Sequence, residues 1–130
     1  MALKVSSNRD GAFLMIDRTF RPDYNRAELS HGSMNAAVEF YKPGLSTLSS
    51  FFSELAAQWR GWEGERQWRS LEAEAALSAT HDRLGTITLA VRLRSSVYTD
   101  IGPTWSASGV IFLDAGGLDT LARDAAALTV

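Results

Sequence analysis

The sequence contains no cysteine and only two histidines, His31 and His81. Without thiols the protein can form neither a disulfide nor a zinc site with thiolate ligands. The two histidines lie far apart in the sequence, without ligand-like residues spaced around them or the partners that a catalytic base requires. Nucleophile-elbow, P-loop and dinucleotide-binding motifs are absent as well. We therefore predict no metal site, no cofactor and no catalytic residue.

Long apolar runs and an excess of positive charge are also missing. No stretch approaches the roughly 20 apolar residues that a membrane-spanning helix needs, and the N-terminal residues become polar too soon for a signal peptide. The formal net charge is -2 and the pI about 5.6, so the sequence lacks the positive charge typical of nucleic-acid-binding proteins. We expect a cytoplasmic protein that binds neither membranes nor nucleic acid.

What is present is the composition of an ordinary globular protein. The 130 residues are 45% hydrophobic and 22% charged, a balance that supports a folded core. No linker, internal repeat or low-complexity segment divides the chain. We predict a single domain over residues 1–130.

The most informative stretch runs from Ser46 to Leu71 and contains three of the four tryptophans. Its first part predicts an amphipathic helix from Ser46 to Trp62, with Ser46 or Thr47 as the N-cap. The residues of its apolar stripe recur at helical spacing: Leu48, Phe51, Phe52, Leu55, Ala56, Trp59 and Trp62. We expect this stripe to pack onto a sheet and to form the centre of the core.

Alternation of apolar and polar residues predicts strands at residues 3–6, 12–20, 34–41, 71–80, 87–94 and 105–113. Residues 21–33 are expected to be mostly loop, with at most a short strand at 27–30. Residues 118–128 predict a C-terminal amphipathic helix, and Gly61 and Gly64 allow the chain to leave the central helix. The predicted fold class is α+β: an antiparallel sheet with one central amphipathic helix and a C-terminal helix, in the order strands-helix-strands-helix.

The strands at 71–80 and 87–94 predict a hairpin whose register follows from parity. Their inward apolar residues are odd-numbered, so same-face pairing requires an odd number of residues in the connection. We expect the loop Asp82-Arg83-Leu84, with His81 opposite Gly85; a left-handed bulge at Gly85 is the alternative. The charged pairs predicted by the three-residue loop are Glu74 with Arg92 and Glu72 with Arg94.

Candidate binding residues gather in the turn after the central helix. Glu63 and Glu65 beside tryptophans are residue types of a carbohydrate site, because glycosidases pair carboxylates and sugars stack on indoles. Two carboxylates in a glycine-containing turn do not fix the geometry that catalysis needs. The alternative is structural: tryptophans fill the core while Glu65 pairs with Arg66. The candidate binding residues are Arg60, Trp62, Glu63, Glu65, Arg66 and Trp68.

The run W-R-G-W-E-G-E-R-Q-W at residues 59–68, continued by Ser70-Leu71-Glu72, resembles the signature of a family of small uncharacterised actinobacterial proteins. The resemblance extends over roughly residues 35–128, whereas residues 21–33 depart from the family's pattern. It implies an architecture and transfers no catalytic residues. The strands-helix-strands-helix order is also distantly similar to that of the WapI-type immunity proteins of bacterial toxin systems, without a shared motif.

These observations support two expectations of function. The first is a non-enzymatic protein-binding domain, of an immunity type that neutralises a bacterial toxin, since the chain is small, mildly acidic and without a catalytic group of residues. The alternative is a small-molecule-binding or hydrolytic protein with a pocket near the Trp62–Trp68 turn. The sequence indicates neither the partner nor the oligomeric state.

Overall fold

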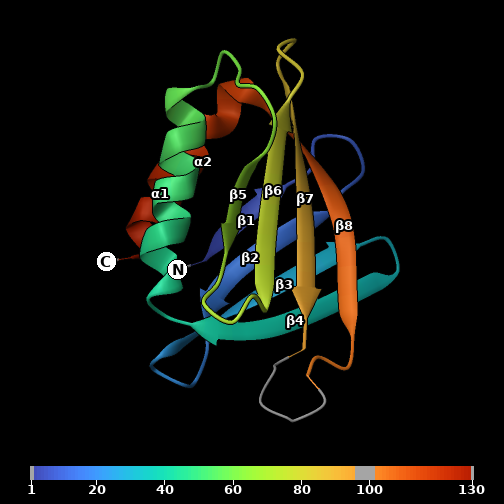
Figure 1. The fold of residues 1–130 in the computed structure, drawn as a ribbon, viewed down its shortest axis with the longest axis vertical. Helices are drawn as coiled ribbons and strands as arrows, with labels where there is room; N and C mark the ends of the chain where they lie inside the picture. Colours follow the sequence, from blue (N-terminus) through green and yellow to red (C-terminus); the bar gives the residue numbers. More distant parts are fainter. Residues whose placement is uncertain (1, 96–101, 130) are drawn as a thin grey trace.

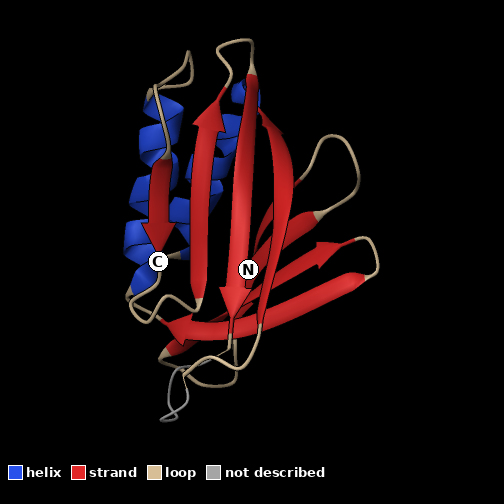
Figure 2. Ribbon diagram, turned by 45° about the vertical axis from the view of Figure 1, so that its right-hand side comes forward, coloured by secondary structure: helices blue, strands red, loops and turns tan. Residues whose placement is uncertain are grey.

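A computed structural model describes residues 2–95 and 102–129 of the chain. Within these residues two four-stranded antiparallel sheets cross at a steep angle, and two helices lie together at one side of them (Figures 1 and 2). The first sheet comprises β1 (Leu3–Ser6), β2 (Phe13–Arg18), β3 (Tyr24–His31) and β4 (Met34–Tyr41). The second comprises β5 (Arg66–Arg69), β6 (Ala75–His81), β7 (Thr86–Arg94) and β8 (Ser106–Asp114). The helices are α1 (Gly44–Ala57) and α2 (Leu118–Leu128), the latter preceded by the 3-10 turn η1 (Ala115–Gly117).

The predicted α+β class and the strands-helix-strands-helix order are confirmed, although the strands divide between two sheets. In each sheet every strand pairs with its neighbour in the chain, so both sheets are simple meanders. β2 and β7 bury alternate residues and leave the others half-buried or exposed, as the pleat requires. The period-two pattern in the sequence therefore predicts which residues of these strands face the core.

The expectation of a mostly irregular segment at residues 21–33 is wrong, because β3 occupies most of it. This strand pairs along its length with both β2 and β4. Ala27 and Leu29 point into the core and are fully buried. Their outward neighbours Arg26 and Glu28 are charged. Because of these charged residues, the sequence pattern does not indicate a strand that is paired on both sides.

The predicted strand at residues 71–80 begins later than expected, and β5 precedes it. Residues 70–74 form a tight turn in which Ala73 has a φ of 58° and Leu71 is exposed. The buried Ser70 hydroxyl closes this turn by accepting the Ala75 N–H at 3.1 Å and donating to the Glu74 carboxylate at 2.8 Å. Glu74 then lies just before β6, where its carbonyl accepts the Arg94 N–H at 2.9 Å, and Ala76 rather than Glu74 faces Arg92.

The hairpin of β6 and β7 confirms the parity argument and corrects the register by two residues. His81 is opposite Ile87 rather than Gly85, and the last closing bond runs from the Asp82 N–H to the Thr86 carbonyl. The connection is therefore Arg83-Leu84-Gly85. The physical reason is that the Asp82 carboxylate accepts the N–H groups of Leu84 and Thr86, at 2.7 and 3.0 Å, and so fixes where the turn begins.

Acid should selectively weaken this hairpin tip. The backbone N–H of Thr86, followed by that of Leu84, lowers the pKa of Asp82 below its ordinary value. A group with a lowered folded-state pKa stabilises the fold above its unfolded pKa and loses that contribution as the pH falls through the folded pKa. Asp82→Asn keeps an acceptor oxygen but removes the charge. We expect this variant to be less stable than the parent in urea at pH 7. The difference in the free energy of unfolding should shrink below pH 4, near the ordinary aspartate pKa of about 3.9. A difference that does not change with pH would contradict this expectation.

Helix α1 is shorter than predicted at its C-terminal end, and its N-terminus has no side-chain cap. Pro43 occupies the N-cap, and the Thr47 hydroxyl instead accepts the indole N–H of Trp68 at 2.9 Å. The helix ends at Ala57, before Trp59, whose side chain is 50% exposed. The prediction that Trp59 packs in the core is wrong. The helix ends before this residue, so helical spacing does not place Trp59 on the buried face.

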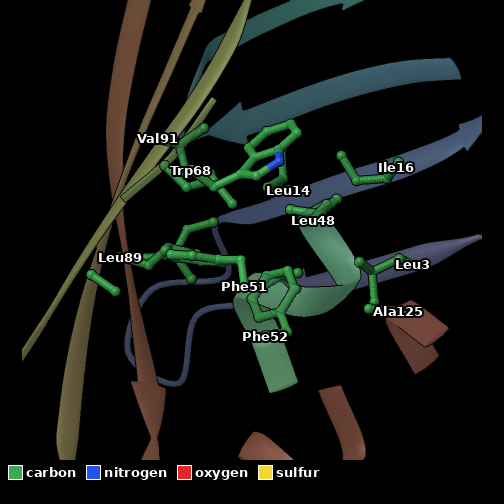
Figure 3. Close-up of a cluster of buried hydrophobic side chains, with 14 of the residues drawn as sticks. Leu3, Leu14, Ile16, Leu48, Phe51, Phe52, Trp68, Leu89, Val91 and Ala125 are labelled. Atoms are coloured by element: carbon green, nitrogen blue, oxygen red, sulfur yellow. The ribbon is translucent and has the colours of Figure 1, made fainter. Parts of the chain in front are cut away.

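The core fills the space between the two sheets and the helices. Figure 3 shows side chains of α1 among residues from both sheets: Leu48, Phe51 and Phe52 lie near Trp68, Leu89 and Val91 of the second sheet and near Leu14 and Ile16 of the first. Phe52 and Leu55 are fully buried, as predicted. The C-terminal helix α2 is confirmed over residues 118–128 and packs beside α1 (Figure 1). Neither helix of the described chain has the length and apolar character needed to cross a membrane.

Candidate functional site

Both tryptophans among the six candidate binding residues are buried. Trp62 is 4% exposed, its indole N–H donates to the Ala79 carbonyl at 3.2 Å, and its ring meets that of His81 edge-on at 5.0 Å. Trp68 is 7% exposed and donates its N–H to Thr47. A buried indole normally needs a partner for its polar N–H, and here each finds one inside the protein. Their rings therefore pack the core.

The four charged candidates lie in the same turn but contact four different neighbours. Arg60 lies over the Trp59 ring, Glu63 is 3.7 Å from Arg83, Glu65 accepts from Gln67, and Arg66 donates to Gln58. The predicted Glu65–Arg66 pair is therefore replaced by separate contacts. The described structure does not bring the six side chains together around one cleft, and their role in binding stays a prediction.

Both histidines contact other residues of the protein. The Nδ1 atom of His81 accepts the Arg83 N–H at 2.7 Å, so its Nε2 carries the proton that is donated to the Trp59 carbonyl at 2.8 Å. His31 lies 3.9 Å from the Asp10 carboxylate. Across residues 2–95 and 102–129, no group of three or more histidine, aspartate or glutamate side chains is arranged to hold a metal ion.

A trough of about 860 Å³ crosses the outer face of the second sheet. Its floor consists of short side chains from the three longer strands, namely Ala76, Ser78, Ala90 and Ser108. Longer side chains border it, among them Gln67, Arg69 and Arg92. Because a twisted sheet is concave along one diagonal, small residues at its centre leave a hollow there. All four strands contribute to this surface.

Arg69 and Arg92 stand in one row across the trough. The register aligns Arg69 of β5 with Ala76 of β6, and Ala76 with Arg92 of β7. Two strand spacings separate the arginine Cα atoms by about 10 Å, and both residues are exposed. No ion pair or hydrogen bond joins either guanidinium to another group of the described residues. Arg94 differs, since it donates to the Ala73 carbonyl at 2.9 Å.

The outer face of the first sheet shows the opposite arrangement. Its cations have partners on the same face: Arg21 pairs with Glu39 at 2.9 Å, Arg26 with Glu28 at 3.4 Å, and Lys4 lies 4.6 Å from the Phe13 ring centre. Each of these three cations thus has a partner on its own face. The second sheet presents Arg69 and Arg92 to solvent without an ion pair or hydrogen bond to any described residue, which makes its outer face the better candidate for recognition.

Sequence reasoning missed this pair for two reasons. Arg92 was assigned to a salt bridge with Glu74, and the two-residue register shift places Ala76 there instead. Arg69 lies in a strand that was read as part of a turn. The available signal was the alternation of Gln67 and Arg69 about the single apolar residue Trp68, which is typical of a short edge strand with one buried face.

Two crossed antiparallel sheets with paired helices at one side, and a trough bordered by arginines on one outer face, define an α+β fold. The chain belongs to a family of unknown function, DUF6228, whose family model matches residues 10–129. This agrees with the expectation of a family without an established activity. A search of the curated proteins found none that matches the chain.

Proposed function

We propose that the protein is a non-enzymatic protein-binding domain that recognises an acidic partner through the outer face of its second sheet. The observation that carries this proposal is the pair formed by Arg69 and Arg92, which flank Ala76 without a counter-ion among the described residues. A carboxylate above Ala76 is within reach of both guanidinium groups. Arginine binds such groups through two parallel hydrogen bonds, which provides specificity as well as affinity.

The Coulomb energies explain why the fold tolerates this arginine pair and why an anionic ligand would gain binding energy from it. Two positive charges about 10 Å apart in water repel by only about 0.4 kcal/mol. A carboxylate about 4 Å from each guanidinium gains about 1 kcal/mol per contact in water, and about four times as much where a partner excludes water. The short side chains of the trough allow that close approach.

The more specific proposal is an immunity-type role, in which the domain binds a bacterial toxin in the cytoplasm and neutralises it. Its support is the small size of the chain and the strands-helix-strands-helix order. In this role the toxin would present acidic side chains to the trough, and nucleic acid would not be a ligand. Co-expression tests this directly: the product of a neighbouring gene should stop the growth of a bacterial host, and this protein should restore it. If no neighbouring product is toxic, the immunity role is contradicted.

A small anionic molecule is the second candidate ligand. The trough volume of about 860 Å³ falls within the roughly 300–1,000 Å³ of small-molecule sites. Its border begins at Gln67 and Trp68, next to the turn where a pocket was expected. A carboxylate or phosphate would use the same arginine pair. Binding of an isolated dicarboxylate as tight as that of a partner protein would favour this reading.

Loss of the arginine pair should weaken partner binding without affecting the fold. We expect Arg92→Ala to raise the dissociation constant about tenfold or more, because hydrogen bonds to charged groups contribute about 1.5–3 kcal/mol. Arg69→Ala should act similarly. Isothermal titration calorimetry with the purified toxic product measures this effect.

The matched control is Arg123→Ala, which removes the same charge from an exposed position on α2. The thermal unfolding midpoints of all three variants should stay close to that of the parent, because exposed substitutions usually change stability by less than about 0.5 kcal/mol. If Arg92→Ala binds as tightly as Arg123→Ala, the recognition face is not the trough.

A further inference from the structure

One edge of the second sheet is open. Within residues 2–95 and 102–129, β8 pairs with β7 on one side and has no strand on the other. At its far end the open side is covered: the Phe112 N–H donates to the Ser7 hydroxyl at 3.2 Å, and the Phe112 carbonyl accepts the Asn8 N–H at 2.9 Å. The backbone groups of Phe112 therefore point away from β7.

In an antiparallel ladder, alternate residues direct their backbone groups to the same side. Ser106, Ser108 and Val110 consequently share the direction of Phe112 and present their N–H and C=O groups at the open edge. No backbone or side-chain hydrogen bond within the described residues engages these groups on that side. The open edge thus offers about three pairs of donors and acceptors at the spacing of a strand.

The sequence of this edge does not protect it. Native edge strands usually carry charged side chains, proline or a bulge that discourages pairing with another chain. The segment Ser106-Ala107-Ser108-Gly109-Val110 contains no charge and no proline, and its register with β7 is unbroken. The β3–β4 hairpin extends past this edge in both views (Figures 1 and 2). Its turn therefore lies beneath the side on which a strand would be added.

We propose that an extended segment of the acidic partner adds to β8 as an antiparallel fifth strand of the second sheet, with an aspartate or glutamate in the row of Ser108 and Arg92. This inference rests on the proposed function and names the way in which the partner binds. Addition of a strand gives affinity through the backbone, and the side-chain rows give specificity.

The charge pattern selects an acidic segment. Ser108 lies between Arg92 and the incoming strand, so an acidic residue opposite Ser108 has its Cα about 10 Å from that of Arg92. The short Ser108 side chain leaves the path open, and an arginine and a glutamate side chain together can span the gap.

A second copy of this chain lacks that complementarity. Antiparallel pairing of two β8 strands about Ser108 would place the serine of one copy opposite the serine of the other. No carboxylate would then stand near Arg92, since the outward residues of the facing segment are Ser106, Ser108 and Val110. The structure therefore favours a peptide segment of a different protein.

The probe is a capped peptide of alternating valine and glutamate, long enough to cover residues 106–110. In an antiparallel pair, the residues whose side chains share the outer face with Ser108 also direct their N–H groups at β8. The glutamates fill these positions when they face Arg92. N-methylation of the glutamates should abolish binding, and methylation of the same number of valines should leave it intact. The two probes have the same charge and the same number of methyl groups.

Hydrogen exchange measured by NMR provides the second readout. The amides of Ser106, Ser108 and Val110 should exchange at least tenfold more slowly in the presence of the valine-methylated peptide. The amides of Ala107 and Gly109 already face β7 and serve as internal references. Arg92→Ala should weaken binding of the unmethylated peptide, whereas Arg123→Ala should not.

The outcomes separate this inference from the proposed function. Equal binding of both methylated peptides, with loss of binding in Arg92→Ala, would overturn strand addition and leave recognition by the trough standing. Binding of the glutamate-methylated peptide alone would overturn the antiparallel direction. If the unmethylated peptide does not bind, or binds equally well to Arg92→Ala, neither proposal survives.

Discussion

Replacement of Trp68 by alanine is expected to lower the free energy of unfolding by about 3–5 kcal/mol, the range for truncation of a large buried aromatic residue. Trp68 joins three elements: it belongs to β5, its N–H binds Thr47 of α1, and its ring packs edge-on against Phe40 of β4 at 5.8 Å. The variant therefore loses buried apolar area. It also contains a cavity at the point where α1 meets the two sheets. Urea denaturation followed by circular dichroism measures the loss.

Trp59→Ala is the matched control, because it removes the same side chain from a position nine residues earlier in the same aromatic run. Trp59 is half exposed, and the Arg60 guanidinium lies 5.1 Å from its ring centre. Partial burial and an exposed cation–π contact together contribute about 1 kcal/mol or somewhat more. A larger loss for Trp59→Ala than for Trp68→Ala would show that the core is centred on the helix end and contradict the packing described above.

The second large effect is expected at Gly109, where the two sheets approach each other closely. A Cβ atom at this position would lie 3.1 Å from Cδ2 of His31 and 3.3 Å from Cδ2 of Leu29, both on β3. Gly109→Leu must force these strands apart. Overpacking costs about 1–3 kcal/mol, and the larger side chain favours the upper part of that range. We expect a net loss of about 2–3 kcal/mol in urea denaturation, with Gly109→Ala intermediate.

Ala90→Leu serves as the control for this substitution. Ala90 lies on β7, next to β8, but points outward into the trough and is exposed. An added side chain there meets no packed neighbour, so the stability should change by less than about 0.5 kcal/mol. Equal losses in the two variants would indicate a general intolerance of larger residues in this sheet, rather than a close crossing of β8 over β3.

The sequence predicts those parts of the fold in which local pattern and burial agree. The stripe through Phe52 and Leu55 predicts a helix with one buried face, and the odd-numbered apolar residues of β6 and β7 fix which side of the hairpin faces inward. These features follow from periodicity alone. Their boundaries do not, because the end of α1 before Trp59 depends on a turn that packs against the β6–β7 tip.

The candidate site was harder to predict because it depends on register. A change of two residues keeps every apolar side chain in the core but replaces Glu74 by Ala76 opposite Arg92. That exchange replaces an expected ion pair by a cation that has no counter-ion among the described residues. Hydrophobic pattern is insensitive to a shift of this size, since it conserves the inward face. The side-chain bonds made by Asp82 and Ser70 lie in the turns at the two ends of β6 and favour the observed register.

The most direct test of the outer face as a recognition surface is a map of backbone amide chemical shifts during titration with the valine–glutamate peptide. The shifts should change at Ala90 and Arg92 of β7 and at their partners Val110 and Ser108 of β8, and a valine–lysine peptide of the same length should leave them unchanged. Changes confined to the outer face of the first sheet, or equal responses to the acidic and basic peptides, would contradict the account.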